Sequence, residues 1–158
     1  MTTPTSGWES RTSSWVGYGA ALWALIFAVL HVVWATGWYV GLNQELSRKA
    51  FEQHWFLVYD LVVAGLCALA VAVALALVQP WGRRLPRWLV GSLAWSGTGL
   101  LVLRGGGGTL QTAYVAAIGR DVLDPMRFWE GWFCLGAVLF SLSTWRFWRA
   151  SRPSQPQS

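Results

Sequence analysis

Residues 55–78 read WFLVYDLVVAGLCALAVAVALALV, an apolar run in which Asp60 is the one charged residue. The run is long enough for a helix to cross a bilayer, and Pro80 and several arginines follow it, as at a membrane surface. The whole chain shares this character, because 54% of its 158 residues are hydrophobic and 12% are charged. A soluble domain is about a quarter charged. The composition therefore predicts an all-α integral membrane protein and excludes a soluble enzyme, a disulfide scaffold and a nucleic-acid-binding domain.

Three further apolar runs extend this prediction to a four-helix bundle. The expected spans are residues 16–40, 55–78, 88–104 and 128–148. The first would be about 37 Å long as a helix, which is more than a secretory signal needs, and it lacks a small-residue cleavage site. The third is short and needs Arg104 to extend its side chain to the interface.

Four consecutive glycines, Gly105 to Gly108, follow the third span. Glycine costs helix stability, so we expect a hinge here, followed by a short interfacial or re-entrant helix up to residue 119. A phosphate-binding loop is the alternative, but the GxxxxGK spacing is absent. A charged turn at 120–125 then leads to the fourth span.

Lysine and arginine counts at the span ends predict the orientation. Seven of these basic residues lie on the side of the membrane that carries both ends of the chain, and five lie on the other side. Basic residues favour the cytoplasmic side. We expect cytoplasmic tails at 1–14 and 149–158 around a transmembrane domain at 15–148. The expected location is the cell membrane, with the lipid bilayer as partner and without nucleic acid.

Ionisable residues of four different spans are predicted to lie in the outer half of the membrane. They are His31, Asp60, Arg104 and Glu130. Charged groups inside a bilayer cost about 3 kcal/mol each at its centre, so they are rare unless they are paired, solvated or functional. This convergence is the main candidate for a functional site.

Helical periodicity predicts that these residues face the interior of the bundle. Asp60 begins a stripe of alanines at every fourth position, and Glu130 begins a similar face with Cys134 and Ala137. His31 shares its face with four aromatic residues, Trp23, Phe27, Trp34 and Trp38. Trp95 is a further tryptophan placed deep in a span, where its N–H needs a partner.

Two interpretations of this constellation remain open. In the first, Asp60, Glu130 and His31 are catalytic residues, and the ligand is bound by Trp23, Phe27, Trp34, Trp38, Trp95 and Arg104. In the second, the charged residues form a polar clasp that holds the helices together. We expect no metal and no cofactor, because His54 lies at a different depth from His31 and no HxxxH or HExxH spacing is present.

Three short motifs resemble a known family. His31-Val-Val-Trp34-Ala, the glycine run after Arg104 and Arg127-Phe-Trp129-Glu130 are similar to the small bacterial membrane proteins of domain-of-unknown-function family 3995. The resemblance covers residues 15–148. It implies a four-span protein of the bacterial inner membrane, and it implies no activity.

Three functions fit the sequence. The first is the binding of a small apolar molecule, such as an isoprenoid, a sterol-like compound or a lipid, in an outer-half pocket. The second is a membrane-embedded isomerase, cyclase or epoxide hydrolase that acts on such a molecule by acid–base catalysis. The third is a structural or accessory subunit, whose small-residue faces dock on a second copy or on another membrane protein.

Overall fold

The computed structural model of the chain describes residues 6–119 and 128–150, with side chains at 15–119 and 129–149. The described residues form α1 (Ser6–Ala35), α2 (Gln44–Phe51), α3 (His54–Val78), the 3-10 helix η1 (Pro80–Arg84), α4 (Arg87–Ala117) and α5 (Phe128–Ala150). No strand occurs among them, so the prediction of an all-α fold is confirmed.

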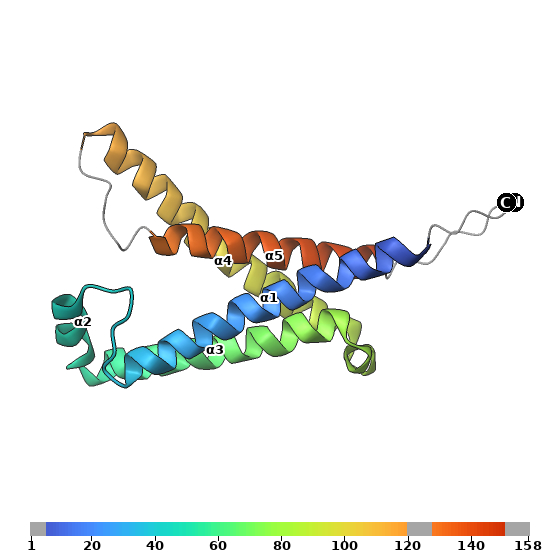
Figure 1. Cartoon of the computed structure of the whole chain (residues 1–158), viewed down its shortest axis with the longest axis horizontal. Helices are drawn as coiled ribbons and strands as arrows, with labels where there is room; N and C mark the ends of the chain where they lie inside the picture. The colour runs from blue at the N-terminus through green and yellow to red at the C-terminus, as the bar shows by residue number, and fades with distance from the viewer. Residues whose placement is uncertain (1–5, 120–127, 151–158) are drawn as a thin grey trace, which may run out of the picture.

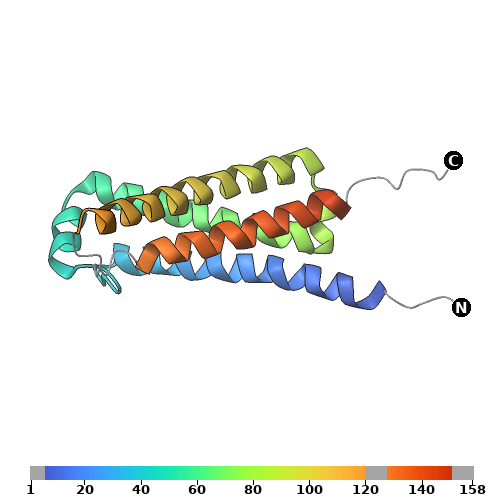
Figure 2. The same ribbon diagram turned by 90° about the horizontal axis from the view of Figure 1, so that it is seen from above.

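The four long helices run alternately in opposite directions (Figures 1 and 2). α1 packs along α3 and α5, and α4 packs along α5 and more loosely along α3. α1 begins and α5 ends at the same end of the bundle as η1, whereas α2 lies at the opposite end (Figure 2). The C-terminal half of α4 diverges from the α1–α3 pair (Figure 1).

Two helices in the described part of the chain have the length and composition of membrane spans. They are the 21 residues Trp15–Ala35 of α1 and the 25 residues His54–Val78 of α3. Both present large apolar side chains outwards, such as Leu22 and Val29 on α1 and Leu61 and Leu66 on α3. A helix that is apolar on its outer as well as its inner face is typical of a lipid environment, so these two helices indicate association with a membrane.

The first helix differs from the expected span at both ends. α1 begins at Ser6, inside the expected tail, and ends at Ala35 instead of residue 40. It stops there because Gly37 adopts a φ of 91°. The Gly37 N–H then donates to the Trp34 carbonyl at 2.9 Å and the Trp38 N–H to the Val33 carbonyl at 3.3 Å, which is a Schellman ending. Residues 1–5, 151–158 and the charged turn at 120–125 lie outside the described residues.

The expected hinge after Arg104 is wrong. α4 continues as one 31-residue helix through the four glycines to Ala117, so no separate helix covers residues 105–119. Packing explains the difference. A Cβ at Gly105 would lie 3.0 Å from the Cys134 backbone, and one at Gly108 would overlap the Glu130 carboxylate. The glycines therefore let α4 approach α5 closely, and this contact outweighs their low helix propensity.

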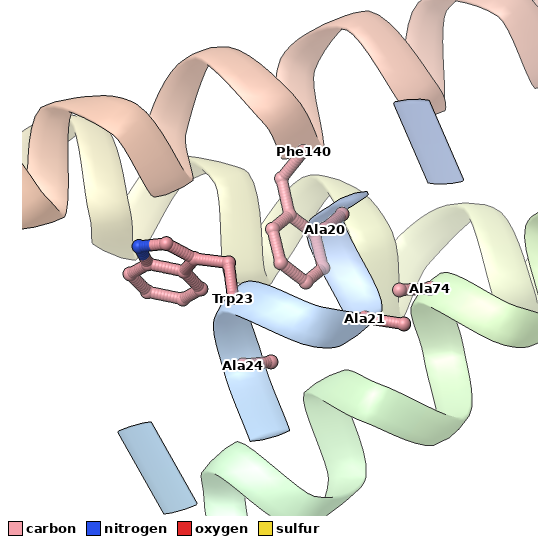
Figure 3. Close-up of a cluster of buried hydrophobic side chains, with 6 residues drawn as sticks. All are labelled: Ala20, Ala21, Trp23, Ala24, Ala74 and Phe140. Atoms are coloured by element: carbon pink, nitrogen blue, oxygen red, sulfur yellow. The ribbon is translucent and has the colours of Figure 1, made fainter. Parts of the chain in front are cut away.

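The centre of the bundle is filled by small residues of α1 and one large ring from α5. Ala20, Ala21 and Ala24 face Ala74 of α3, and the Phe140 ring points from α5 towards them (Figure 3). Trp23 lies beside this cluster and its indole N–H donates to the Trp132 carbonyl at 2.9 Å. Its ring occupies the space that a side chain at Gly136 would fill.

Candidate functional site

A histidine and an aspartate from neighbouring helices form a buried pair. His31 lies one turn before the end of α1, and Asp60 lies in the second turn of α3. His31 Nδ1 and Asp60 Oδ1 are 2.6 Å apart, and the two residues are 8% and 3% exposed. The short separation is typical of a hydrogen bond to a carboxylate.

The second polar atom of each of these side chains has no partner among the described residues. His31 Nε2 and Asp60 Oδ2 are both buried and make no hydrogen bond. Leaving a buried polar atom without a hydrogen bond costs about 1–3 kcal/mol, so such an atom in a native structure calls for an explanation. The pair therefore offers one free nitrogen and one free oxygen to a further group.

Four aromatic side chains, Phe27, Trp34, Trp129 and Phe133, form what we call the aromatic cluster. Two of them contact the imidazole edge-on, because the ring centroids of Phe27 and Trp34 lie 4.7 and 4.8 Å from that of His31. Phe133 lies 5.2 Å from Phe27, and Trp129 lies 5.4 Å from Trp34. Rings from α1 and α5 thus interlock beside the histidine.

A second ion pair lies on the far side of the aromatic cluster. Arg104 Nη1 of α4 donates to Glu130 Oε2 of α5 at 2.8 Å. The guanidinium also lies 4.5 Å from the centre of the Phe133 ring, which is a cation–π contact. The side chains are 47% and 19% exposed, so this pair is partly open where the His31–Asp60 pair is closed.

Two tryptophans of the aromatic cluster hold the loop between α1 and α2 against this cluster. The Trp34 indole N–H donates to the Val40 carbonyl at 2.9 Å, and the Trp129 indole N–H donates to the Gly41 carbonyl at 3.1 Å. Gly41 has a φ of 75°, and a Cβ there would lie 3.0 Å from the Trp129 ring. The loop therefore needs glycine at this position.

The structure brings together some of the residues that the sequence assigns to one site and separates others. His31, Asp60, Phe27 and Trp34 lie together, with Arg104 and Glu130 paired beyond them. Trp23 lies deeper, packed on Trp132 and Phe140. Trp38 and Trp95 are 72% and 47% exposed, and no contact of theirs with the aromatic cluster is seen in the described residues.

Trp129 and Phe133 are residues of the site that the sequence analysis did not single out. In the sequence, Trp129 is noted only as part of the motif Arg127-Phe-Trp129-Glu130. Their i, i+4 spacing, one residue before Glu130 and one before Cys134, was the available signal. It places both rings on one face of α5, next to the face that carries Glu130.

The comparison with known proteins identifies the family. The family described as "Protein of unknown function (DUF3995)" matches residues 24–140, which is more than half of the chain. The chain belongs to this family. The DUF3995 match contains both polar pairs and the whole aromatic cluster. No match was found among curated proteins or among solved structures.

The arrangement has a definite chemical capacity. The Asp60 carboxylate holds one nitrogen of the imidazole, so the ring orientation is fixed and Nε2 is left to accept or donate a proton. No group of three His, Cys, Asp or Glu side chains that could hold a metal ion occurs within the part of the chain that the structure describes. The site thus combines a fixed polar pair with an aromatic wall.

Proposed function

We propose that this DUF3995 protein crosses the membrane four times and binds a small, largely apolar molecule through the His31–Asp60 pair. The observation that supports this function is the pair of buried, unsatisfied atoms, His31 Nε2 and Asp60 Oδ2. When Nε2 carries a proton, a hydroxyl group can accept a hydrogen bond from Nε2–H and donate one to Oδ2, which offsets the cost of leaving both atoms without partners.

The four crossings are supported by length and direction. At 1.5 Å per residue α4 and α5 are about 46 and 34 Å long, enough to span a hydrocarbon core of about 30 Å. Both run antiparallel to their neighbours, like the two apolar helices beside them (Figure 2). The polar side chains of α4 and α5 do not exclude a crossing, because polar side chains of membrane helices face the interior of the bundle instead of lipid.

The distribution of charge supports the orientation. Arg83, Arg84 and Arg87 lie at the η1 end of the bundle, with Arg146 and Arg149 in the last turns of α5. The opposite end carries fewer basic residues, Arg48, Lys49 and Arg104, in the described part of the chain. Positive charge favours the cytoplasm, so the His31–Asp60 pair lies in the extracytoplasmic half.

The surroundings of the pair suit a ligand that is apolar apart from one polar group. The aromatic cluster supplies ring faces and edges, and Arg104 and Glu130 supply charge only beyond Phe133. An isoprenoid alcohol, a sterol-like compound or a lipid with a free hydroxyl has this composition. Because both atoms are buried, the ligand reaches them only when a neighbouring segment moves, and we assign this movement to the loop that Trp34 and Trp129 hold.

The test is to identify what copurifies with the protein. Wild type and the Asp60→Asn and His31→Phe variants are purified in a mild detergent, and their extracts are compared by mass spectrometry. We expect one hydroxyl-bearing apolar compound in near-equimolar amount with wild type and its depletion from both variants. Glu45→Gln is the control, since it removes an exposed ion pair with Lys49 at the same end.

A polar clasp predicts another outcome. If Asp60 only holds α1 to α3, the extracts of wild type and Asp60→Asn are identical, while the variant unfolds at a lower temperature. That result would reject ligand binding at this pair. It would support the structural role.

A second function is favoured by the fixed orientation of the imidazole. A histidine whose Nδ1 is held by a carboxylate is arranged to act as a general acid or base through Nε2. An isomerase that moves a proton within the bound molecule would use this arrangement. Conversion of the copurified compound by wild type, without conversion by His31→Phe, distinguishes this enzyme from a binding protein.

A further inference from the structure

A cavity lies at the opposite end of the bundle from the His31–Asp60 pair. It is a groove between α3 and α4 with a volume of about 120 Å³. Its walls include Leu69, Ala72 and Val73 of α3, Leu89 and Leu93 of α4, and the Trp81 ring of η1. No polar side chain contributes to the lining, so the groove suits a hydrocarbon chain better than a soluble polar molecule.

The turn at η1 is folded back against the end of α3, which closes one end of this groove. Gly82 is buried, and a Cβ at this position would overlap the Ala76 carbonyl group. Only glycine allows this approach of η1 to α3. As a result Trp81 and Leu85 line the groove, and Arg83 and Arg84 lie between these two residues in the sequence.

Three arginines that lie between lining residues of the groove in the sequence are exposed and free of acidic partners in the described residues. Arg83 and Arg84 end η1, and Arg87 begins α4. The ion pairs of the described side chains involve other residues, namely His31–Asp60, Lys49–Glu45 and Arg104–Glu130. Guanidinium groups bind phosphate oxygens in a planar, two-pronged geometry.

We infer that this groove is a binding site for an anionic phospholipid. One acyl chain lies between α3 and α4 along Leu69, Ala72 and Leu93, and the phosphate lies against Arg83, Arg84 and Arg87. The combination of an apolar groove with arginines next to it in the sequence selects a lipid over free phosphate, which has no apolar part. Basic pockets at the cytoplasmic face of membrane helices take up anionic headgroups in this manner. The site is separate from the proposed ligand site.

The test measures lipid retention by native mass spectrometry of the full chain in detergent. Phosphatidylglycerol and phosphatidylcholine with identical acyl chains are added separately, and inorganic phosphate is added in excess to a third sample. We expect phosphatidylglycerol to be retained about tenfold better than phosphatidylcholine, and phosphate not to displace it. Changing Arg83, Arg84 and Arg87 together to glutamine should abolish this preference.

Two controls separate the groove from general electrostatic attraction. Arg48→Gln with Lys49→Gln removes basic residues at the other end and should leave the preference unchanged. Ala72→Phe fills the groove and should lower retention of phosphatidylglycerol, whereas Ala68→Phe, exposed on α3 but outside the groove, should not. Equal retention of both lipids, displacement by phosphate, or no effect of the triple arginine variant would overturn the inference.

Discussion

At the scale of single residues, glycines decide which side chains meet. Gly108 leaves room for the Glu130 carboxylate, and Gly136 leaves room for the Trp23 indole. In both places a large or charged group lies directly on the backbone of a neighbouring helix. The contacts between helices are therefore controlled by where a Cβ is missing as much as by which side chains are present.

Gly136 provides the sharpest stability prediction of this kind. Gly136→Ala drives a methyl group into the Trp23 ring, which is buried and anchored to the Trp132 carbonyl. Overpacking of a rigid core should lower the free energy of unfolding by about 1–3 kcal/mol. Gly131→Ala on the same helix meets open space and should raise it by up to about 1 kcal/mol, because alanine favours the helix. Thermal unfolding in detergent measures both, and equal effects would contradict this packing.

The pairing of His31 with Asp60 could be anticipated at the residue scale, but its surroundings could not. Depth along each helix predicted that the two residues lie near each other. Alanines at every fourth position predicted one continuous stripe below Asp60, yet Ala68 and Ala72 are exposed while Cys67 and Ala74 are buried. A spacing of four drifts around a helix of 3.6 residues per turn, whereas Asp60, Ala64, Cys67 and Ala74 follow a heptad spacing of about 3.5 residues per turn.

At the scale of the elements, α4 shows how tertiary packing overrides local propensity. Four consecutive glycines predicted a break, and the helix continues because two of them face α5 at close range. A Cβ added at either of the other two, Gly106 or Gly107, would meet no atom of a neighbouring element within 4 Å. Sequence alone does not say which glycines have a neighbour, so this continuity could not be predicted.

The two kinds of glycine in this run make a testable pair. Gly106→Ala with Gly107→Ala should raise the free energy of unfolding, by up to about 1 kcal/mol per site, because alanine favours the helix and nothing obstructs its methyl group. Gly105→Ala with Gly108→Ala should lower it, since the methyl groups meet Cys134 and displace Glu130 from Arg104. Chemical denaturation in detergent compares the two. A loss of stability in the first variant would show that residues 106 and 107 work as a hinge.

At the scale of the whole molecule, the two ends of the bundle have different chemistry. The α2 end carries the buried His31–Asp60 pair and a loop held by tryptophans, whereas the η1 end carries an apolar groove and three exposed arginines next to it in the sequence. The all-α class and the two most apolar helices were predictable from composition and run length. The aromatic cluster was not, because it joins residues about a hundred positions apart whose contact depends on how α1 and α5 pack.

The central claim is that four crossings place the two ion pairs on the extracytoplasmic side and the arginine groove on the cytoplasmic side. Labelling of single cysteines with a membrane-impermeant maleimide, in intact cells and after lysis, tests it most directly. In a background where Cys67 and Cys134 are alanine, we place one cysteine at Glu45 in α2, Arg84 in η1 or Ile118 after α4, all exposed positions. We expect Glu45→Cys and Ile118→Cys to react in intact cells, and Arg84→Cys to react only after lysis. Reaction of Arg84→Cys and Ile118→Cys from the same side would show that α4 does not cross, which is incompatible with four crossings.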